Sequence, residues 1–195
     1  RQNQYFLDAL SVDPDLLDPF NVLTCNSFLC EELVIGDQVT VDGYIVDGKV
    51  EIFGMTGAVF LPHSNSFSHH VFPCFFEPEL NTRIKDTIQR LIPELGLNNN
   101  FFNVELRVDQ TSGSFRILEV NSRIAFQFAK TIQSVTGYDP LHLLCDVATG
   151  RTPQYDMQSE DTYPLCFNYE LHSLTDKWIL RTPTQSDFEE LRIRF

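Results

Sequence analysis

The chain has 195 residues, and its 43% hydrophobic content is enough for one substantial core or for two small lobes that share a sheet. Its formal net charge of −13 and its lack of basic runs argue against a nucleic-acid partner, because phosphate backbones are bound by clustered Lys and Arg. No apolar run approaches the roughly 20 residues that span a bilayer, and the five cysteines occur without any glycosylation sequon. We therefore expect a globular, cytoplasmic protein with no membrane partner.

The first third of the chain predicts the end of one lobe followed by a hairpin. The segment from Tyr5 to Leu17 mixes apolar and acidic residues, and a second apolar segment runs from Phe28 to a turn at Gly36. Taken alone, that second segment is an ordinary edge strand. The Asp-Gly pair in Val46–Gly48 then predicts a hairpin between strands 38–45 and 49–55, since Asp-Gly between apolar runs is a strong turn signal.

A polar and aromatic loop and a helix come next. Residues 60–76 place histidines and serines among aromatic residues, which favours the lining of a substrate pocket. A zinc site at His69 and His70 is disfavoured, because adjacent residues point to opposite sides of a strand. Residues 81–92 predict a helix that is capped by Asn81 or Thr82 and that ends or kinks at Pro93.

A second hairpin carries the most informative residues. Its strands are 103–107 and 117–123, and the loop 111–113 has the form of a three-residue connection with glycine at the left-handed position. The register that follows from this loop sets Glu105 directly opposite Glu119. The two-residue period of a strand then places Asn121 on the same face as Glu119.

Two facing carboxylates repel each other, so a cation is expected between them. Two carboxylates and an amide form an all-oxygen set, which suits Mg²⁺ better than zinc. The alternative is that Glu105 and Glu119 are solvated residues on the exposed face of a sheet. Arg123, two residues beyond Asn121, favours a phosphate site, because its guanidinium can stabilise developing anionic oxygen.

The rest of the chain predicts helices and a final strand-like region. One helix covers 124–135 and stops at Gly137, and a second opens with Asp139 as cap and Pro140 in its first turn and ends at Gly150. Beyond Pro153 the chain is acidic and then strand-like, with no assignable role. Together these elements predict an α+β fold built on an antiparallel sheet with flanking helices.

The second hairpin resembles the signature of the ATP-grasp ligases, which is an acidic residue on one strand and Glu-x-Asn-x-Arg on the next. Here these are Glu105 and the segment Glu119-Val120-Asn121-Ser122-Arg123. The resemblance implies an ATP-grasp fold in which Glu105, Glu119 and Asn121 hold two Mg²⁺ ions that bridge the β- and γ-phosphates of ATP. It also implies a catalytic Arg123 that orients a substrate carboxylate or an acyl-phosphate.

Residues 28–43 look like the adenine hinge of the same family. The match implies an ATP site that includes Glu31 and in which the backbone of Glu32, Leu33 and Val34 binds the adenine edge. Leu118 would press on the adenine ring. Gln38 stands where the family commonly has a glutamate for the ribose hydroxyls, and its amide can still donate and accept hydrogen bonds.

By this resemblance, residues 1–27 end a lid lobe, residues 28–153 form the central and C-terminal lobe with the hinge and the metal site, and residues 154–195 are an extension of unknown role. The glycine-rich phosphate loop of the family and its lysines should precede the hinge. No Gly precedes Gly36 and no Lys precedes Lys49, so we expect the later part of a larger ligase.

The function implied is that of an ATP-dependent ligase that joins a small-molecule carboxylate to an amine through an acyl-phosphate. Arg107 and the aromatic loop favour amino-acid substrates, and a homo-oligomer is compatible with this interpretation. Two alternatives stay open. One is a biotin-carboxylase-like or nucleotide-precursor enzyme of the same superfamily, and the other is a degenerate domain that binds nucleotide or a partner without turnover.

Overall fold

A computed structural model describes residues 31–151, 153, 162–170, 172, 178 and 180–194 of the chain. The chain divides into two compact units, Arg1–Val34 and Ile35–Phe195. The predicted lobe end at 1–27 and the first three residues of the predicted hinge lie outside the described residues. The fold below is that of the second unit.

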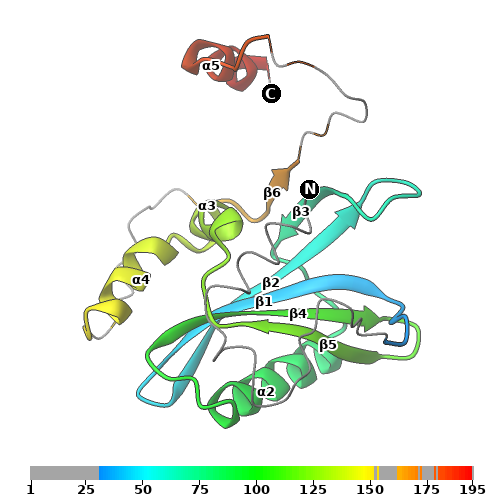
Figure 1. Ribbon diagram of the computed structural model, residues 1–195, viewed down its shortest axis with the longest axis vertical. Helices are drawn as coiled ribbons and strands as arrows, with labels where there is room; N and C mark the ends of the chain where they lie inside the picture. The colour runs from blue at the N-terminus through cyan, green and yellow to red at the C-terminus, as the bar shows by residue number, and fades with distance from the viewer. Residues whose placement is uncertain are drawn as a thin grey trace, which may run out of the picture. The chain divides into compact units, whose positions relative to one another are not determined.

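The second unit is built on a six-stranded antiparallel sheet (Figure 1). The strands are ordered β5-β4-β1-β2-β3-β6 across the sheet, so the hairpin that carries the proposed site occupies one edge. Their bounds are β1 Asp37–Val46, β2 Lys49–Phe60, β3 Phe67–Phe72, β4 Asn100–Asp109, β5 Ser114–Asn121 and β6 Cys166–Tyr169. The prediction of an α+β fold with an antiparallel sheet is confirmed.

Strands β1 and β2 form the predicted Asp-Gly hairpin. The turn consists of Asp47 and Gly48, whose φ angles are 48° and 75°. Positive φ at both central residues is typical of the two-residue turn whose twist matches that of the strands, and Asp-Gly is a preferred pair for it. The connection is thus shorter by one residue than the predicted Val46–Gly48, because Val46 pairs with Lys49.

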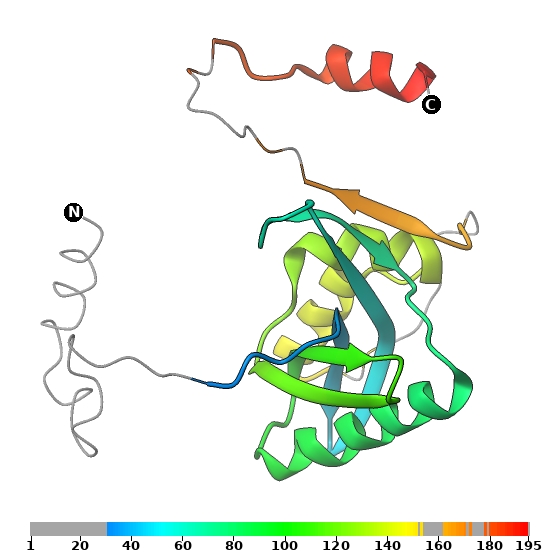
Figure 2. The same cartoon turned by 90° about the vertical axis from the view of Figure 1, so that its right-hand side faces the viewer.

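One face of the sheet packs against helix α2, Pro78–Glu94 (Figure 2). Four residues of α2 at spacings of four, namely Leu80, Ile84, Ile88 and Ile92, are buried against apolar residues of β1 and β4. The helix starts three residues before the predicted Asn81, because Pro78 suits the first turn. Instead of capping the helix, the Asn81 side chain bonds the backbone N–H and C=O of Phe76.

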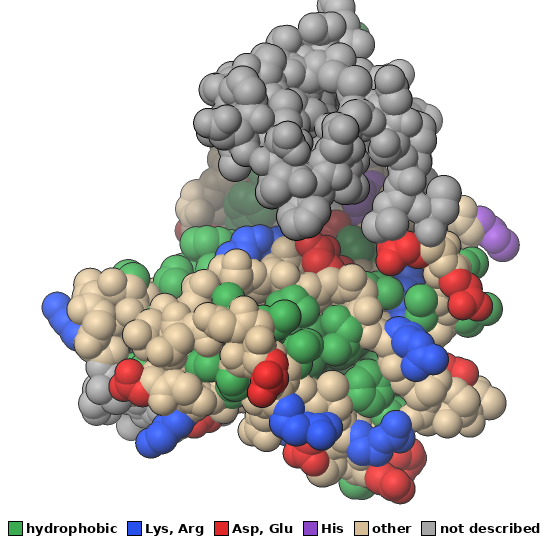
Figure 3. Space-filling view, turned by 60° about the horizontal axis from the view of Figure 1, so that its bottom comes forward, with side chains coloured by type: hydrophobic (Ala, Val, Ile, Leu, Met, Phe, Trp, Pro, Cys, Tyr) green, Lys and Arg blue, Asp and Glu red, His purple; other side chains and the backbone are tan. Residues whose placement is uncertain are grey.

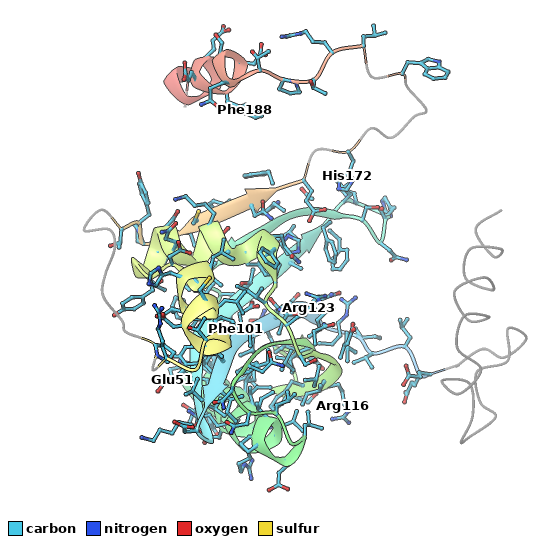
Figure 4. The ribbon with its side chains drawn as sticks, turned by 60° about the vertical axis from the view of Figure 1, so that its left-hand side comes forward. Glu51, Phe101, Arg116, Arg123, His172 and Phe188 are labelled. Atoms are coloured by element: carbon cyan, nitrogen blue, oxygen red, sulfur yellow. The ribbon has the colours of Figure 1, made fainter. Side chains whose placement is uncertain are left out.

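The other face of the sheet is partly covered by α3, Phe126–Thr136, and α4, Pro140–Ala148. Leu143 and Val147 of α4 pack on Phe101 of β4, and Figure 4 shows Phe101 beneath this helix. Two predicted helix ends are confirmed. Gly137 closes α3 in the left-handed conformation, and the Asp139 carboxylate accepts a hydrogen bond from Leu141 N–H over 2.9 Å at the start of α4.

The strand-like region predicted near the C-terminus is β6, which pairs with the far edge of the sheet. Cys166–Tyr169 runs antiparallel to β3, so His70 lies opposite Asn168. A last helix, α5, covers Gln185–Arg194. On the surface around α2, charged side chains of both signs lie beside apolar ones (Figure 3). None of the described helices combines the length and the apolar character needed to cross a membrane.

Candidate metal and nucleotide site

The β4–β5 hairpin places Glu105 directly opposite Glu119 and Asn103 directly opposite Asn121. Directly paired residues of an antiparallel ladder project to the same face, so the predicted facing carboxylates are present. The predicted turn is wrong by one residue. Asp109 pairs with Ser114, which leaves the four residues 110–113 in the loop, and the Asp109 carboxylate accepts bonds from Thr111 N–H and Ser112 O–H.

A bulge corrects the register before it reaches the glutamates. Leu106 pairs with Ile117, whereas Glu105 pairs with Glu119, so Leu118 is an extra residue on β5. Without this extra residue, the register of the turn would pair Glu105 with Leu118 and Glu119 with Val104. The two glutamates would then point to opposite faces of the sheet.

Strand β1 extends the polar face beyond the hairpin. Thr40 pairs with Glu105, and Asp42 pairs with Asn103. On the far side of β1, Thr40 also pairs with Thr56 of β2. Two polar rows therefore cross this face, which we call the polar rows: Glu119–Glu105–Thr40–Thr56 and Asn121–Asn103–Asp42.

The two glutamates have no cationic partner within the described part of the chain. Glu105 accepts a hydrogen bond from Gln38 Nε2 over 3.2 Å, and neither Glu105 nor Glu119 forms an ion pair there. Arg123 follows β5 in the connection to α3 (Figure 4), where its Nη1 donates to the carbonyl of Ile124 over 3.3 Å. The negative charge of the facing carboxylates is thus available to an added cation.

Asp42 is a buried carboxylate in the middle of the polar rows, with 4% of its surface exposed. Its Oδ1 accepts a hydrogen bond from Asn103 Nδ2 over 2.8 Å, and its Oδ2 accepts one from Thr40 Oγ1 over 3.3 Å. Burial raises the pKa of Asp42 to about 7, although these two hydrogen bonds and the charge of Arg123 oppose the rise.

Two buried polar atoms of the same rows have no hydrogen-bond partner among the residues that the structure describes. They are Nδ2 of Asn121 and Oγ1 of Thr56. Buried polar groups are almost always satisfied, so the unsatisfied amide of Asn121, beside the facing carboxylates, favours a surface that is completed by a ligand.

This donor set fits Mg²⁺ bound together with a phosphate ligand. No group of three or more His, Cys, Asp and Glu side chains is placed to hold a metal among the residues described. A protein cage of that kind is not what Mg²⁺ requires, because it is usually held by one or two carboxylates with substrate phosphates and water. Glu105, Glu119 and Asn121 provide two carboxylates and an amide oxygen on one face.

The other predicted ATP contacts stay predictions. Glu31, Glu32, Leu33 and Val34 are described, and Leu33 is 85% exposed, but they belong to the first unit, so their adenine role stays a prediction. Gln38 bonds Glu105, and Leu118 is the bulge residue with 44% of its surface exposed. Their roles toward ribose and adenine also stay predictions.

Arg107 bonds the backbone of the predicted hinge segment just before β1 begins. Its Nη1 donates to the carbonyl of Gly36 over 3.0 Å, and its guanidinium lies 5.3 Å from the centre of the Phe60 ring. Gly36 has a φ of 135°, and a Cβ there would lie 2.6 Å from the carbonyl oxygen of Val108. Glycine is therefore required at this position within the predicted hinge segment 28–43.

The two adjacent histidines of β3 are separated by the sheet. The His69 ring stacks on Tyr169, while the buried His70 ring contacts Phe128 of α3. Nδ1 of His70 lies 3.4 Å from a Glu170 carboxylate oxygen, and burial lowers the pKa of His70. This separation agrees with the sequence argument against a zinc site formed by both rings.

Asp42 and its partners Thr40 and Asn103 are site residues for which the sequence motifs predict no role. A signal for them was present. Gln38, Thr40 and Asp42 alternate with Val39 and Val41, and an acidic residue on such a half-apolar strand is unusual enough to mark a site.

The family of the chain follows from comparison with known proteins. The ATP-grasp domain family matches residues 17–132, more than half of the chain, and the chain therefore belongs to the ATP-grasp family. No curated protein sequence matches it significantly.

Solved structures share its fold. Phosphoribosylglycinamide synthetase from Anaerococcus prevotii matches 63% of this chain with 18% identity and a TM-score of 0.56, over 31% of its own length. The L-amino acid ligase from Bacillus licheniformis matches 58% with 18% identity and a TM-score of 0.52, over 29% of its length. The MgADP-bound biotin carboxylase domain of Hydrogenobacter thermophilus 2-oxoglutarate carboxylase matches 67% with 16% identity and a TM-score of 0.55, over 28% of its length. The chain thus spans less than a third of each.

Proposed function

We propose that this chain forms the metal- and phosphate-binding part of an ATP-dependent carboxylate–amine ligase. The observation that carries the proposal is the facing of Glu105 and Glu119, with Asn121 on the same face and no cationic partner within the described residues. Membership of the ATP-grasp family supports the same assignment.

In this proposal Glu105, Glu119 and Asn121 hold Mg²⁺, which, when bound, neutralises charge on the β- and γ-phosphates of ATP. Arg123 lies two residues past Asn121 and would orient the substrate carboxylate as it attacks the γ-phosphorus and displaces ADP. The amine then attacks the carbonyl carbon of the acyl-phosphate, phosphate leaves, and the nitrogen loses a proton to give the amide. Phosphoryl transfer of this kind depends on positioning and on charge stabilisation, so no side-chain nucleophile is required.

The proposed substrates are a small-molecule carboxylate and an amine, with amino acids as the first pair to test. In the first unit, Glu31–Val34 are the proposed contacts of the adenine edge. In the second unit, Leu118 is the proposed contact of the adenine ring and Gln38 that of the ribose. Because Gln38 already bonds Glu105, ribose binding there would couple the nucleoside end of ATP to a proposed metal ligand.

Calorimetric titration of the chain with ATP, with and without Mg²⁺, tests the proposal. We expect Mg²⁺-dependent binding that is lost in Glu119→Gln, which keeps the shape of the side chain but removes its charge. Glu51→Gln is the matched control, because Glu51 is an exposed glutamate of β2 outside the polar rows.

Two outcomes would count against the proposal. Equal Mg²⁺-dependent binding by wild type and Glu119→Gln would remove the metal assignment. Wild type without any ATP binding would favour a degenerate, non-catalytic domain. A screen of carboxylate and amine pairs for ADP release then identifies substrates, and release with bicarbonate and biotin in place of amino acids would favour the carboxylase alternative.

A further inference from the structure

One cross-strand row, Asp42–Asn103–Asn121, runs across β1, β4 and β5. Asp42 on β1 pairs with Asn103 on β4, and Asn103 pairs with Asn121 on β5. Asp42 and Asn103 are 4% and 3% exposed, so most of their surface is withdrawn from water. The three side chains therefore depend on one another for hydrogen bonds.

Asp42 fixes the orientation of the Asn103 amide. An ionised carboxylate only accepts hydrogen bonds, so Asn103 must turn its NH₂ group toward it, and Nδ2 does so over 2.8 Å. Thr40 holds the second oxygen of the same carboxylate over 3.3 Å. The Oδ1 atom of Asn103 is then left as an acceptor, and no donor from the described residues reaches it.

Asn121 lacks an acceptor for its NH₂ group. Its Nδ2 is buried and has no partner within the described part of the chain, and the proposed metal role requires its other amide atom, Oδ1, to point at the cation. If Oδ1 serves the cation, Nδ2 must donate elsewhere, and Oδ1 of Asn103, directly opposite on the neighbouring strand, is an acceptor of the right kind.

We propose that Asp42 and Asn103 are positioning residues that orient the amide of Asn121 for metal binding. Asp42 directs the NH₂ of Asn103 toward itself, and Oδ1 of Asn103 receives Nδ2 of Asn121 when Asn121 Oδ1 binds the cation. Outer partners of this kind commonly change metal affinity by about 10- to 100-fold. This inference rests on the proposed function, because it assigns Asn121 as a metal ligand.

Asp42→Asn is the central variant, since it keeps the shape of the side chain but can offer NH₂ in place of an acceptor. Asp146→Asn is the matched control, because Asp146 is also a buried carboxylate, 7% exposed, but lies on α4. ATP affinity is measured by calorimetry in EDTA and in Mg²⁺ at about pH 8, where Asp42 is ionised because its pKa is about 7.

We expect Asp42→Asn to reduce the gain in ATP affinity that Mg²⁺ provides by about tenfold, with affinity in EDTA unchanged. Asp146→Asn should keep the full gain. Mn²⁺ in place of Mg²⁺ gives a second readout, because its binding can be followed by water-proton relaxation. The affinity for Mn²⁺ in the presence of ATP should fall by the same factor in Asp42→Asn.

A double-mutant cycle separates positioning from a general structural effect. If Asp42 acts through Asn121, Asp42→Asn has no further effect on metal dependence in an Asn121→Ala background. An equal effect of Asp42→Asn in both backgrounds would overturn the inference while leaving the proposed function in place. So would an Asp42→Asn protein in which Mg²⁺ raises the ATP affinity as much as in wild type.

Asn103→Ala provides the same test if Asp42→Asn does not fold, because it removes the middle of the row and leaves Asp42 bonded to Thr40. We expect the same loss of Mg²⁺ dependence. A wild-type protein that shows no Mg²⁺-dependent ATP binding would instead remove the proposed function and this inference together.

Discussion

Gln38 Nε2 donates a hydrogen bond to Oε2 of Glu105 over 3.2 Å. The bond joins the residue expected at the ribose to the first proposed metal ligand, across the adjacent strands β1 and β4. A neutral amide at this position partners Glu105 without adding a third negative charge beside Glu119.

Replacing Gln38 with Glu should destabilise the protein in the absence of metal. The new carboxylate repels Glu105, and like charges on neighbouring strands cost up to about 1 kcal/mol. For a domain of this size that corresponds to a melting temperature lower by roughly 2–4 °C. Millimolar Mg²⁺ should reduce the difference in melting temperature between Gln38→Glu and wild type. Gln38→Leu is the control that removes the hydrogen bond without adding charge, and a metal-free Gln38→Glu protein as stable as Gln38→Leu would contradict the prediction.

The stability contributed by Asp42 should fall as the pH rises. Its pKa is about 7 in the folded protein against a usual 3.8, so the folded state binds the proton more tightly than the unfolded state. The favourable contribution is fully present below pH 3.8, declines between about pH 4 and 7, and is constant above that. Three pKa units correspond to about 4 kcal/mol as an upper estimate.

Urea unfolding of wild type and Asp42→Asn across this pH range measures the effect. The Asn variant lacks the titrating group, so its stability relative to wild type should rise between pH 4 and 7 and then level off. A difference between the two proteins that stays flat from pH 4 to 8 would show that Asp42 titrates normally.

His70 should have the opposite dependence. Burial lowers its pKa below the usual 6.5, although Glu170 opposes this shift. The folded state therefore favours the neutral ring, and its contribution to stability is lost as the pH falls from 6.5 through the lowered pKa. We expect His70→Gln to lose less stability than wild type between pH 7 and 5. His69→Gln is the control on the opposite face of β3, and equal pH dependence in His70→Gln and wild type would refute the prediction.

Replacing Gly36 with Ala should destabilise the second unit strongly. The added Cβ would lie 2.6 Å from the carbonyl oxygen of Val108, and the φ of 135° is unfavourable for any L side chain. Gly96→Ala is the control, because Gly96 also has a positive φ, 74°, but has no atom within 4 Å of its added Cβ. We expect Gly36→Ala to cost at least about 2 kcal/mol more in urea unfolding than Gly96→Ala. Equal costs would show that the backbone at Gly36 moves to accommodate the methyl group.

The β4–β5 hairpin shows how far a sequence argument can reach. Alternation and a glycine-containing turn predict two strands and the pairing of Glu105 with Glu119, which is confirmed. The turn used to obtain that pairing is one residue too short, and the bulge at Leu118 restores the register. The adjacent apolar residues Ile117 and Leu118 do break the alternation of β5, but a three-residue turn without a bulge and a four-residue turn with one give the same pairing of Glu105 with Glu119. The pairing alone therefore could not separate the two differences.

Asp42 shows the other limit. Its place on the site face follows from the period of two, but its burial depends on Asn103 and on the packing of elements distant in sequence. The predicted cap at Asn81 is wrong for a different, local reason, since the Asn81 side chain bonds the backbone of Phe76, five residues earlier and before the helix. Long-range packing decides the burial of Asp42, whereas competition from a nearby backbone segment decides the role of Asn81.

The Glu105–Glu119 and Asn103–Asn121 pairs lie at the end of the β4–β5 hairpin that is remote from its turn. The turn joins the two strands covalently at one end, whereas at the other end the chain leaves β5 toward Arg123 and α3. A divalent ion bound by both strands would link their ends there. Occupancy of the site would then slow the fraying of the strand ends and hold the start of the Arg123 segment, so ligand binding and local order would rise together.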